Sequence, residues 1–223
     1  MKAEYITHSG DDLLVVNSAR VSMAKEHSEF QDNDKGLLKY LATHGHWTPF
    51  SHPQITLRET VPIFVARQRF KHMVGHTYNE VSRRYVDDEP EFYTPDIWRS
   101  RPDGSIKQGS GDGKVDFLAH EFQSCFGGAK QINEAYTDYT FVCRDLYCNM
   151  IEAGVAPEQA RMVLPQSMYT SYYVTGSLAA FARAYVQRID AHAQKEIQDL
   201  AVQWGDIISP LYPESWEALT CQI

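Results

Sequence analysis

The sequence predicts a soluble α/β protein built as a single domain, with a cationic pocket for a small anionic ligand. Its 223 residues are enough to bury one substantial core. Hydrophobic residues make up 43% of the chain and charged residues 22%, close to the averages of soluble globular proteins. One segment, residues 61–85, carries five arginines and lysines in a chain whose net charge is -8, and such a segment creates a local field that can attract an anion. By charge alone, a solvated basic face is an equally good interpretation.

Composition also excludes several classes of protein. No apolar run approaches the roughly 20 residues that cross a bilayer, and the first ten residues, MKAEYITHSG, lack the apolar core of a secretory signal, so we expect a cytoplasmic protein without membrane contact. A pI of about 5.6 argues against general binding to nucleic acid. The four cysteines, Cys125, Cys143, Cys148 and Cys221, form no CxxC pair and no close cysteine-histidine group, which predicts free thiols without a zinc site or a disulfide framework.

The first sixty residues predict a helix, a loop and a strand. The short apolar run at 13–16 fits either a strand or the start of a helix. Leucines at helical spacing predict a helix over 35–42, capped by an aspartate at position 32 or 34 and ended near Gly45. Glycine and proline make 44–52 a loop, whose three histidines we interpret as hydrogen-bonding groups rather than metal ligands. Polar and apolar residues alternate over 54–60, which predicts a half-buried strand.

The middle of the cationic segment predicts a helix that carries ligand-binding side chains. A proline suits its first turn, and its core-facing stripe would be Ile63, Ala66, Phe70 and Val74. The neighbouring stripe has spacings of three and four, so its side chains can converge on one ligand; these are Gln68, Lys71 and His72. Gly75 ends or distorts the helix, and residues 79–85 continue as a turn or an extended segment.

The second half of the chain predicts mainly helices. After a turn, residues 91–95 fit a short edge strand, and residues 99–114, rich in glycine, serine and charge, predict a flexible excursion inside the domain. Helical composition extends over 117–153 with a break at two glycines, and its predicted buried stripe is Ile132, Tyr136, Tyr139, Cys143, Leu146 and Met150. The remaining predictions are a short helix at 157–164, a strand at 167–175, a helix at 177–189 and a last helix at 192–208, whose buried face is Ile197, Leu200, Ala201 and Trp204.

Two arginines outside the cationic segment strengthen the case for a nucleotide ligand. Arg161 and Arg188 lie in segments that must be largely buried, where a guanidinium needs a partner: an internal salt bridge, a phosphate or a planar imide edge. The sequence contains no GxGxxG, GxxxxGK[ST] or GxSxG motif, which leaves no argument for a Rossmann site, a P-loop or a nucleophile elbow. Ser82 could act as a nucleophile only beside a base, so we expect its hydroxyl to contact a phosphate.

Five blocks of the sequence, in the same order, resemble those of flavin-dependent thymidylate synthases. The central block is PIFVARQ at 62–68 followed by NEVSRRY at 79–85, and the others are SARVS at 18–22, HGHWTPF at 44–50, ARMVLP at 160–165 and RIDAHAQKEI at 188–197. The likeness covers most of the chain outside residues 86–150. Enzymes of this family methylate dUMP without a cysteine nucleophile.

The resemblance implies a fold, a reaction and partners. The fold would be α+β, with a twisted, mainly antiparallel sheet flanked by helical layers, in a homotetramer whose active sites draw residues from several subunits. The enzyme would be a methyltransferase of dTMP biosynthesis, which converts dUMP to dTMP with methylenetetrahydrofolate as carbon donor. FAD, reduced by NADPH, would carry the hydride. The expected small-molecule partners are therefore dUMP and folate.

The resemblance also assigns residues to the site. Arg188 would grip and polarise the pyrimidine, and Arg188 and Ser82 are the predicted catalytic residues. The predicted dUMP ligands are Gln68, Arg69, Lys71, Glu80, Val81, Ser82, Arg83, Arg84, Arg161 and Arg188. The predicted FAD ligands are Ser22, His46, Thr48, Lys71, His72, Met73, Glu80, Ser177 and Arg183. Cationic donors near the pyrimidine would stabilise negative charge on the ring during the reaction.

The cofactor side departs from the family pattern. An Arg-His-Arg triplet with seven residues before the serine is here Lys71-His72-Met73 with eight, and an Asn-x-Arg near the start of the penultimate helix is Ser177-Leu-Ala179, with Arg183 one turn later. Ser51 stands where an acidic residue is common. Two alternatives therefore stay open. One is a nucleotide- or flavin-binding protein that has lost synthase activity. The other is a metal-dependent nucleotide hydrolase based on His44, His46, His52, His72 and His76.

Overall fold

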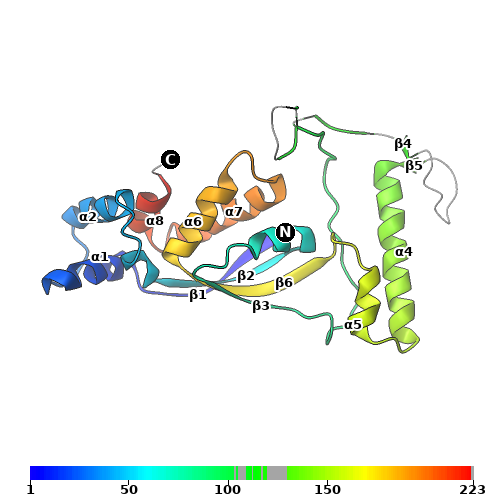
Figure 1. The fold of residues 1–223 in the computed structure, drawn as a ribbon, viewed down its shortest axis with the longest axis horizontal. Coiled ribbons are helices and arrows are strands. Elements are labelled where there is room, and N and C mark those ends of the chain that lie inside the picture. Colours follow the sequence, from blue (N-terminus) through cyan, green and yellow to red (C-terminus); the bar gives the residue numbers. More distant parts are fainter. Residues whose placement is uncertain (103, 105–108, 112, 117, 120–129, 222–223) are drawn as a thin grey trace. The chain divides into compact units, whose positions relative to one another are not determined.

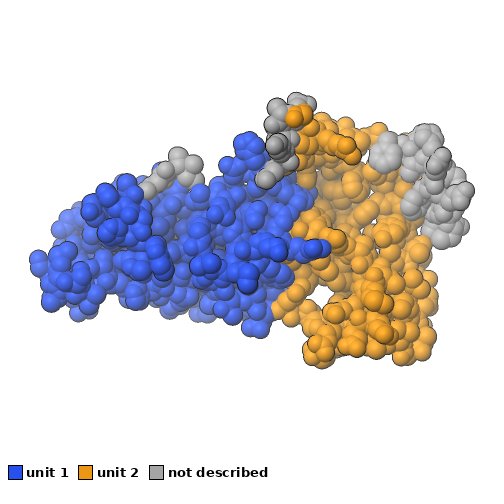
Figure 2. Space-filling view, in the orientation of Figure 1, with its two compact units in different colours: residues 1–60, 67–79, 171–223 blue, residues 61–66, 80–170 orange. Residues whose placement is uncertain are grey.

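The computed structural model describes residues 1–102, 104, 109–111, 113–116, 118–119 and 130–221, in two compact units (Figure 2). Unit 1 consists of Met1–Thr60, Arg67–Asn79 and Ser171–Ile223, and unit 2 of Val61–Ala66 and Glu80–Thr170. Neither unit is one continuous stretch of sequence. None of the helices in the described ranges is long and apolar enough to cross a membrane.

The fold contains a four-stranded antiparallel sheet with the strand order β1, β2, β6, β3 (Figure 1). The strands are β1 (Lys2–Ser9), β2 (Gln54–Pro62), β3 (His76–Glu80) and β6 (Tyr169–Ser177). Burial alternates along β2, where Ile55, Leu57 and Glu59 are buried. The strand predicted at 54–60 is therefore confirmed, and β6 confirms the strand predicted at 167–175.

Helices of unit 1 lie over one face of the sheet, where Figure 1 shows α6 and α7. The helical elements of this unit are α1 (Asp12–Arg20), η1 (Val21–Met23), α2 (Asp32–Thr43), η2 (Pro49–Ser51), α6 (Leu178–Ile189), α7 (Lys195–Ile208) and α8 (Pro213–Thr220). The helices predicted at 35–42, 177–189 and 192–208 are confirmed, and the four residues of the predicted α7 face all have an exposed fraction of 0%. The ambiguous run at 13–16 belongs to α1. The sheet with its covering helices confirms the α+β class.

Two elements of unit 1, β1 and α8, have no counterpart among the predictions. Every residue of β1 is exposed or half-exposed, so the strand lacks the buried alternation that reveals strands such as β2. The helix α8 has only eight residues, with Trp216 and Ala218 buried, and is too short to repeat an apolar stripe. Sequence periodicity could not identify either element.

Unit 2 is built around one long helix. Its elements are α4 (Ile132–Glu152), α5 (Pro157–Ala160), η3 (Arg161–Val163) and a small antiparallel pair, β4 (Leu118–Ala119) with β5 (Lys130–Gln131). The predicted stripe of α4 is wrong in part: Cys143 is buried, but Tyr139 and Leu146 are each 46% exposed. Large apolar side chains occur on several faces of α4, and its other buried residues are Ala135, Thr140 and Tyr147. The helix contacts α5 and η3.

The connecting segments of unit 2 match the predictions only in part. The strand expected at 91–95 is reduced to a single bridge between Phe92 and Met168. The ends of the expected excursion at 99–114 are joined by a bridge between Arg99 and Lys114, and its positions 103, 105–108 and 112 lie outside the described residues. The same is true of residues 117 and 120–129 of the helical segment expected from 117.

The helix in the cationic segment, α3 (Ile63–Arg69), is shorter than predicted. After it the chain turns, with Gly75 at a φ of 79°, and enters β3, which pairs with β6. Val74 is 74% exposed, so the expectation that it faces the core is wrong. The predicted convergence of Lys71 with its neighbours on one helical face is also wrong, because pairing in the sheet and the left-handed glycine override a continued helix.

Candidate functional site

Arg69 lies in the core of unit 1, with an exposed fraction of 0%. Its Nε atom donates to both carboxylate oxygens of Glu59, at 3.2 Å each, and its Nη1 atom donates to Tyr78 Oη at 2.7 Å. The guanidinium carbon lies 4.5 Å from the ring centroid of Trp204. A ligand could reach this cation only by entering the core. We therefore assign Arg69 to the core, which corrects its predicted role as a dUMP ligand.

Two tyrosines complete this buried cluster. Tyr172 Oη donates to Glu59 Oε2 at 2.6 Å, and Tyr78 Oη donates to the backbone oxygen of His72 at 2.8 Å. Burial raises the pKa of Tyr78 to about 12, and burial together with the charge of Glu59 raises the pKa of Tyr172. Both phenols remain protonated donors at neutral pH. The cluster thus fixes the backbone that leads from α3 to His72.

His72 and Arg188, predicted on the flavin side and the pyrimidine side of the site, contact each other directly. Arg188 Nε donates to His72 Nε2 at 2.8 Å, and the residue His72 is 8% exposed. Burial and the charges of Arg188, Arg69 and Arg183 lower the pKa of His72 to about 4. The imidazole is therefore neutral at pH 7 and accepts through Nε2. Half-buried Arg188 keeps its other guanidinium N–H groups for further partners.

Gln68 belongs to a short chain of hydrogen bonds in the same unit. Its Nε2 atom donates to Gln194 Oε1, and Gln194 Nε2 donates to Glu196 Oε2 at 2.8 Å. Glu196 is buried, with an exposed fraction of 4%. Neither Gln194 nor Glu196 was predicted as a site residue. Both lie in the block RIDAHAQKEI that resembles the family, but no periodicity or spacing singles them out.

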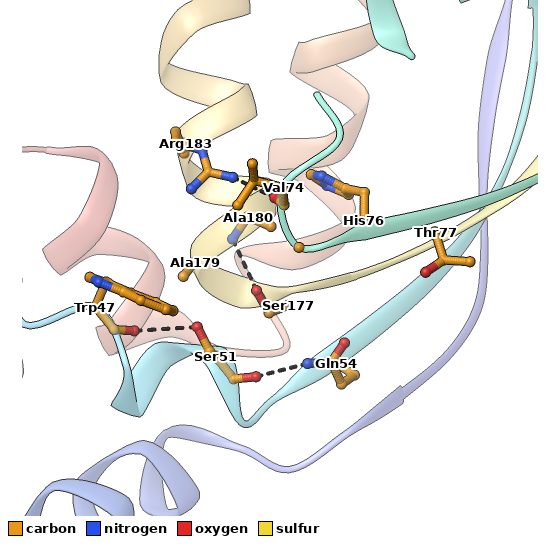
Figure 3. A pocket seen from close by; sticks show the side chains of 11 residues that line it. Trp47, Ser51, Gln54, Val74, His76, Thr77, Ser177, Ala179, Ala180 and Arg183 are labelled. Atoms are coloured by element: carbon orange, nitrogen blue, oxygen red, sulfur yellow. Dashed lines mark hydrogen bonds between the residues drawn. The ribbon is translucent and has the colours of Figure 1, made fainter. Parts of the chain in front are cut away.

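A cavity of about 540 Å³ opens in unit 1 beside the start of α6 (Figure 3). Its volume falls in the range of small-molecule and cofactor sites. Two of the predicted FAD ligands, Ser177 and Arg183, line it, together with Trp47 and Ser51 from the predicted loop. The other lining residues are Gln54, Val74, Gly75, His76, Thr77, Ala179 and Ala180.

The polar groups of this cavity favour an anionic ligand. Ser177 caps α6, with its Oγ accepting from the Ala180 N–H at 3.2 Å, and the helix N-terminus carries partial positive charge. Arg183, one turn into α6, donates from Nη2 to the backbone oxygen of Val74 at 2.5 Å. Figure 3 shows Arg183 and Ser177 on the α6 side of the cavity. Small residues, Ala179 among them, leave the helix start uncovered.

Close packing fixes one wall of the cavity. A Cβ atom on Gly176 would lie 2.4 Å from His76 Cδ2, and one on Gly75 would lie 2.9 Å from the Ala180 Cβ. The two ring nitrogens of His76 are buried and have no hydrogen-bond partner among the described residues. Burial, followed by the charge of Arg69, lowers the pKa of His76 to about 2. His76 is therefore a neutral wall of the cavity at neutral pH.

The other FAD ligands predicted in unit 1 lie around rather than in this cavity. Those that do not line it are Ser22, His46, Thr48, Lys71, His72 and Met73. All of them except His72 are exposed, and Met73 is 72% exposed. Ser22 Oγ donates to the backbone oxygen of Ala19 at 3.1 Å. Trp47, between two predicted ligands, contributes to the cavity although it was not predicted.

Unit 2 brings five of the predicted dUMP ligands together around a second pocket, of about 340 Å³. They are Glu80, Val81, Ser82, Arg83 and Arg161, and the pocket is completed by Ile63, Leu164, Met168 and Thr170. Glu80, assigned like Lys71 to both dUMP and FAD, accepts from Thr170 Oγ1 at 2.7 Å. Arg84 does not line the pocket, and its Nε atom lies 3.7 Å from Glu158 Oε2.

The donors of this second pocket suit a phosphate group. Arg161 is exposed, and its Nε atom donates to the Glu158 backbone oxygen at 3.3 Å, which leaves other guanidinium N–H groups for a ligand. Arg83 is oriented by Asp88, whose Oδ1 atom lies 2.7 Å from Nη1. Ser82 Oγ accepts from the Arg84 N–H at 3.3 Å. Within the described ranges no carboxylate or imidazole bonds this hydroxyl, so it lacks the base that a nucleophile needs.

The described residues contain no group of three or more histidines, cysteines, aspartates or glutamates that could hold a metal ion. His44 instead stacks on Tyr40, with ring centroids 4.1 Å apart. Among the cysteines, Cys143, Cys148 and Cys221 are free thiols, and Cys125 lies outside the described residues.

Comparison with known proteins finds relatives that share one description, thymidylate synthase. The family model described as "Thymidylate synthase complementing protein" matches residues 4–214. A flavin-dependent thymidylate synthase of Thermosipho africanus is 35% identical over 94% of this chain and 86% of its own length, and that of Kosmotoga olearia is 37% identical over 94% and 85%. The corresponding protein of Thermus thermophilus is 33% identical over 96% of this chain and 73% of its own length.

Solved structures agree with these relatives. The UMP/dUMP methylase PolB from Streptomyces cacaoi, bound with 5-Br dUMP, superposes with a TM-score of 0.79 at 30% identity, covering 99% of this chain and 94% of that one. The same methylase bound with 5-Br UMP gives a TM-score of 0.79 at 28% identity, with 99% and 93% covered.

Proposed function

Because the chain belongs to the Thy1 family, described as thymidylate synthase complementing proteins, we propose that it methylates dUMP to dTMP with a bound flavin as hydride carrier. It is an enzyme of the flavin-dependent thymidylate synthase type. The carbon donor in this proposal is methylenetetrahydrofolate, and NADPH reduces FAD. The observation that carries the proposal is the pocket of unit 2, which is lined by five of the dUMP ligands that the resemblance implies.

The residues present fit a flavin nucleotide in the cavity of unit 1. The α6 N-terminus, the Ser177 hydroxyl and Arg183 supply donors for a pyrophosphate, and exposed Trp47 supplies an aromatic face. Ala179 stands where the family pattern has an arginine. Arg183 lines the same cavity and supplies a positive charge there instead. When bound, FAD supplies the hydride.

The chain's own residues bind the nucleotide and stabilise charge. Arg161, Arg83 and Ser82, which line the pocket of unit 2, are assigned to the phosphate, because their N–H and O–H groups match its acceptor oxygens. Arg188 is assigned to the pyrimidine, where a guanidinium near a carbonyl oxygen stabilises the negative charge that develops on the ring. The hydrogen bond from Arg188 Nε to His72 fixes the plane of that guanidinium before substrate binds.

The proposal does not require a cysteine nucleophile. None of the three described cysteines is among the residues that line either pocket. It also includes a homotetramer. Tyr139, Phe141 and Leu146 on α4 are 46–47% exposed, which supplies apolar surface for contacts between subunits.

The direct test is an assay of the purified protein with dUMP, methylenetetrahydrofolate, NADPH and FAD. We expect dTMP to form when all four compounds are present, and we expect no dTMP when any one of them is left out. A protein that binds flavin and dUMP but forms no dTMP would be a binding protein, and a metal-dependent release of phosphate or base would indicate a hydrolase. Either result would contradict the proposal.

The phosphate pocket is tested by a matched pair of arginine variants. Arg161→Ala should weaken dUMP binding at least about tenfold, because a charge-assisted hydrogen bond is lost. Arg144→Ala is the control, since Arg144 lies in the same unit, pairs with Glu89 at 3.0 Å and does not line the pocket. If the two variants bind dUMP with equal affinity, Arg161 does not contact the nucleotide.

UMP is a second candidate substrate, favoured by the likeness to PolB, a methylase whose solved structures hold analogues of both UMP and dUMP. Competition between the two nucleotides at equal concentration, followed by analysis of the methylated products, distinguishes them.

A further inference from the structure

The turn at 73–76, which leads from α3 to β3, is joined to α6 at two points. The backbone oxygen of Gly75 accepts from the Ser177 N–H at 3.2 Å, and the backbone oxygen of Val74 accepts from Arg183 Nη2 at 2.5 Å. All four residues line the cavity of unit 1, and Figure 3 shows Val74 beside Arg183. The turn and the first two turns of α6 therefore form one continuous wall of this cavity.

This turn can take up the additional residue that distinguishes the chain from the family pattern. Residues 74–81 separate Met73 from Ser82, which is one residue more than the pattern has. The register of β3 is set by its pairing with β6, so the extra length falls in the turn before His76, where the strand begins. Gly75 has a φ of 79°, and a Cβ on it would lie 2.9 Å from the Ala180 Cβ. The longer turn thus packs closely on α6.

Ala179 and Arg183 are neighbours on one face of α6, because residues four apart in a helix lie one above the other. Long side chains on a helix lean toward its N-terminus, so the Arg183 guanidinium covers the turn around position 179. Ala179, which carries only a methyl group, leaves that surface free. An arginine at both positions would place two guanidinium groups in the same space. The cation of the family pattern is therefore found one helical turn later in this chain.

The Val74 oxygen holds the Arg183 guanidinium in place. Arg183 is exposed, and an exposed arginine without a partner loses rotamer freedom when it binds a ligand. Its bond to Val74 uses one of five N–H groups, and the others remain as donors. Neither aspartate nor glutamate occurs among the described residues that line the cavity. The positive charge of Arg183 is therefore available to an anion there.

We propose that the longer turn, Ala179 and Arg183 are one coordinated change, in which Arg183 becomes the anchor for a nucleotide diphosphate and the Val74 oxygen positions it. The inference rests on the proposed function, which places FAD in this cavity. The guanidinium and the N-terminus of α6 offer donors to the same anion. Binding of the diphosphate half of FAD thus depends on Arg183, while binding of the flavin ring does not.

The experiment measures dissociation constants for the two halves of FAD separately. Flavin fluorescence reports binding of FAD and of riboflavin, which lacks the diphosphate, and ADP is measured by its displacement of FAD. Arg183→Ala should weaken FAD and ADP at least about tenfold, because a charge-assisted hydrogen bond is lost, and should leave riboflavin unchanged. Added salt should weaken FAD and ADP in the wild-type protein, but not riboflavin.

A second variant tests the coordinated change itself. The double variant Arg183→Ala/Ala179→Arg returns an arginine to the family position and should recover most of the affinity for FAD and ADP. Arg183→Lys keeps the charge without the fork, so it should weaken FAD by a smaller factor than Arg183→Ala, and it keeps the test valid if Arg183→Ala does not fold.

Arg58→Ala is the matched control. Arg58 is also an exposed arginine of unit 1 with a hydrogen bond, from Nε to Ser171 Oγ at 3.1 Å, but it does not line the cavity. This variant should leave all three dissociation constants at their wild-type values.

Wild-type affinities for FAD and ADP in folded Arg183 variants would overturn the inference. So would an equal loss for riboflavin, because Arg183 would then shape the cavity instead of binding the diphosphate, and so would a folded double variant without recovery. These results leave dTMP formation by the wild-type enzyme intact. Failure of the wild-type protein to bind FAD would instead overturn the proposed function.

Discussion

The two units contain ion pairs of opposite kinds. In unit 1 the pair of Arg69 with Glu59 lies in the core, and both side chains are 0% exposed. In unit 2 the pair of Arg84 with Glu158 lies at the surface, and both side chains are more than half exposed. Interactions between charges are strong where water is excluded and weak where it is present. The buried pair therefore holds its arginine in place, whereas exposed arginines of unit 2, such as Arg161, are available to a ligand.

The largest effect should come from breaking the buried pair. Glu59→Gln leaves the Arg69 guanidinium in the core without an opposite charge and should lower the free energy of unfolding by about 3–5 kcal/mol. Urea denaturation measures the loss. Glu217→Gln is the control, because Glu217 lies 3.9 Å from Lys39 in a pair that is about 60% exposed, and its loss should be within the error of the measurement. If the two variants lose similar amounts of unfolding free energy, the buried pair is no stronger than the exposed pair, which would contradict the account.

A comparable effect, on rate instead of stability, is expected at Arg188. Arg188→Ala removes the guanidinium assigned to the pyrimidine and should lower kcat for dTMP formation about 10²–10³-fold. Cys148→Ala should leave kcat largely unchanged. Loss of activity in a folded Cys148 variant would contradict a mechanism without a cysteine nucleophile.

The burial of His72 beside Arg188 should make stability depend on pH, because both lower the pKa of the imidazole. The pKa of His72 falls from 6.5 to about 4 on folding, so between these values the unfolded chain binds a proton that the folded chain does not. Stability should therefore decrease as the pH falls from 6.5 to about 4. His72→Gln keeps an acceptor but does not titrate, and should flatten this part of the curve. If His72→Gln retains the wild-type slope of unfolding free energy against pH, His72 is not held neutral by its surroundings.

The smallest effect is expected at the wall of the unit 1 cavity, which we propose binds the flavin. Gly176→Ala places a Cβ 2.4 Å from His76 Cδ2 and should destabilise the protein by about 1–3 kcal/mol while weakening FAD binding. Gly36→Ala, in α2 with no atom within 4 Å of its Cβ, should stabilise it by about 0.5–1 kcal/mol. Thermal unfolding and flavin titration distinguish the two. A Gly176 variant as stable as wild type would show that His76 can move aside at no measurable cost in stability.

The sequence predicts most of the fold where an apolar pattern is strong. The stripe of α7 and the alternation of β2 are both found as predicted, because each element buries one face. The exposed strand β1 and the short helix α8 lack that signal. On α4 the pattern misleads, since exposed side chains such as Tyr139 are as apolar as buried ones.

The site shows the same division. Five predicted dUMP ligands, Arg161 and Ser82 among them, line the pocket of unit 2, and all five belong to blocks with a family likeness. Its other lining residues, Ile63, Leu164, Met168 and Thr170, were not predicted as ligands. Arg69 is wrongly assigned to it, since a basic residue in a short segment gives no sign that Glu59, on another strand, neutralises it. Glu196 is missed because its role depends on hydrogen bonds to a segment more than a hundred residues away in sequence.

The most direct test of the central claim is a single turnover without NADPH. The protein is loaded with reduced FAD under anaerobic conditions and mixed with dUMP and methylenetetrahydrofolate, while the flavin absorbance and the dTMP formed are both measured. We predict that one flavin is oxidised for each dTMP, and that oxidation needs both substrates. Formation of dTMP while the flavin stays reduced, or oxidation of the flavin without dTMP, would contradict the account.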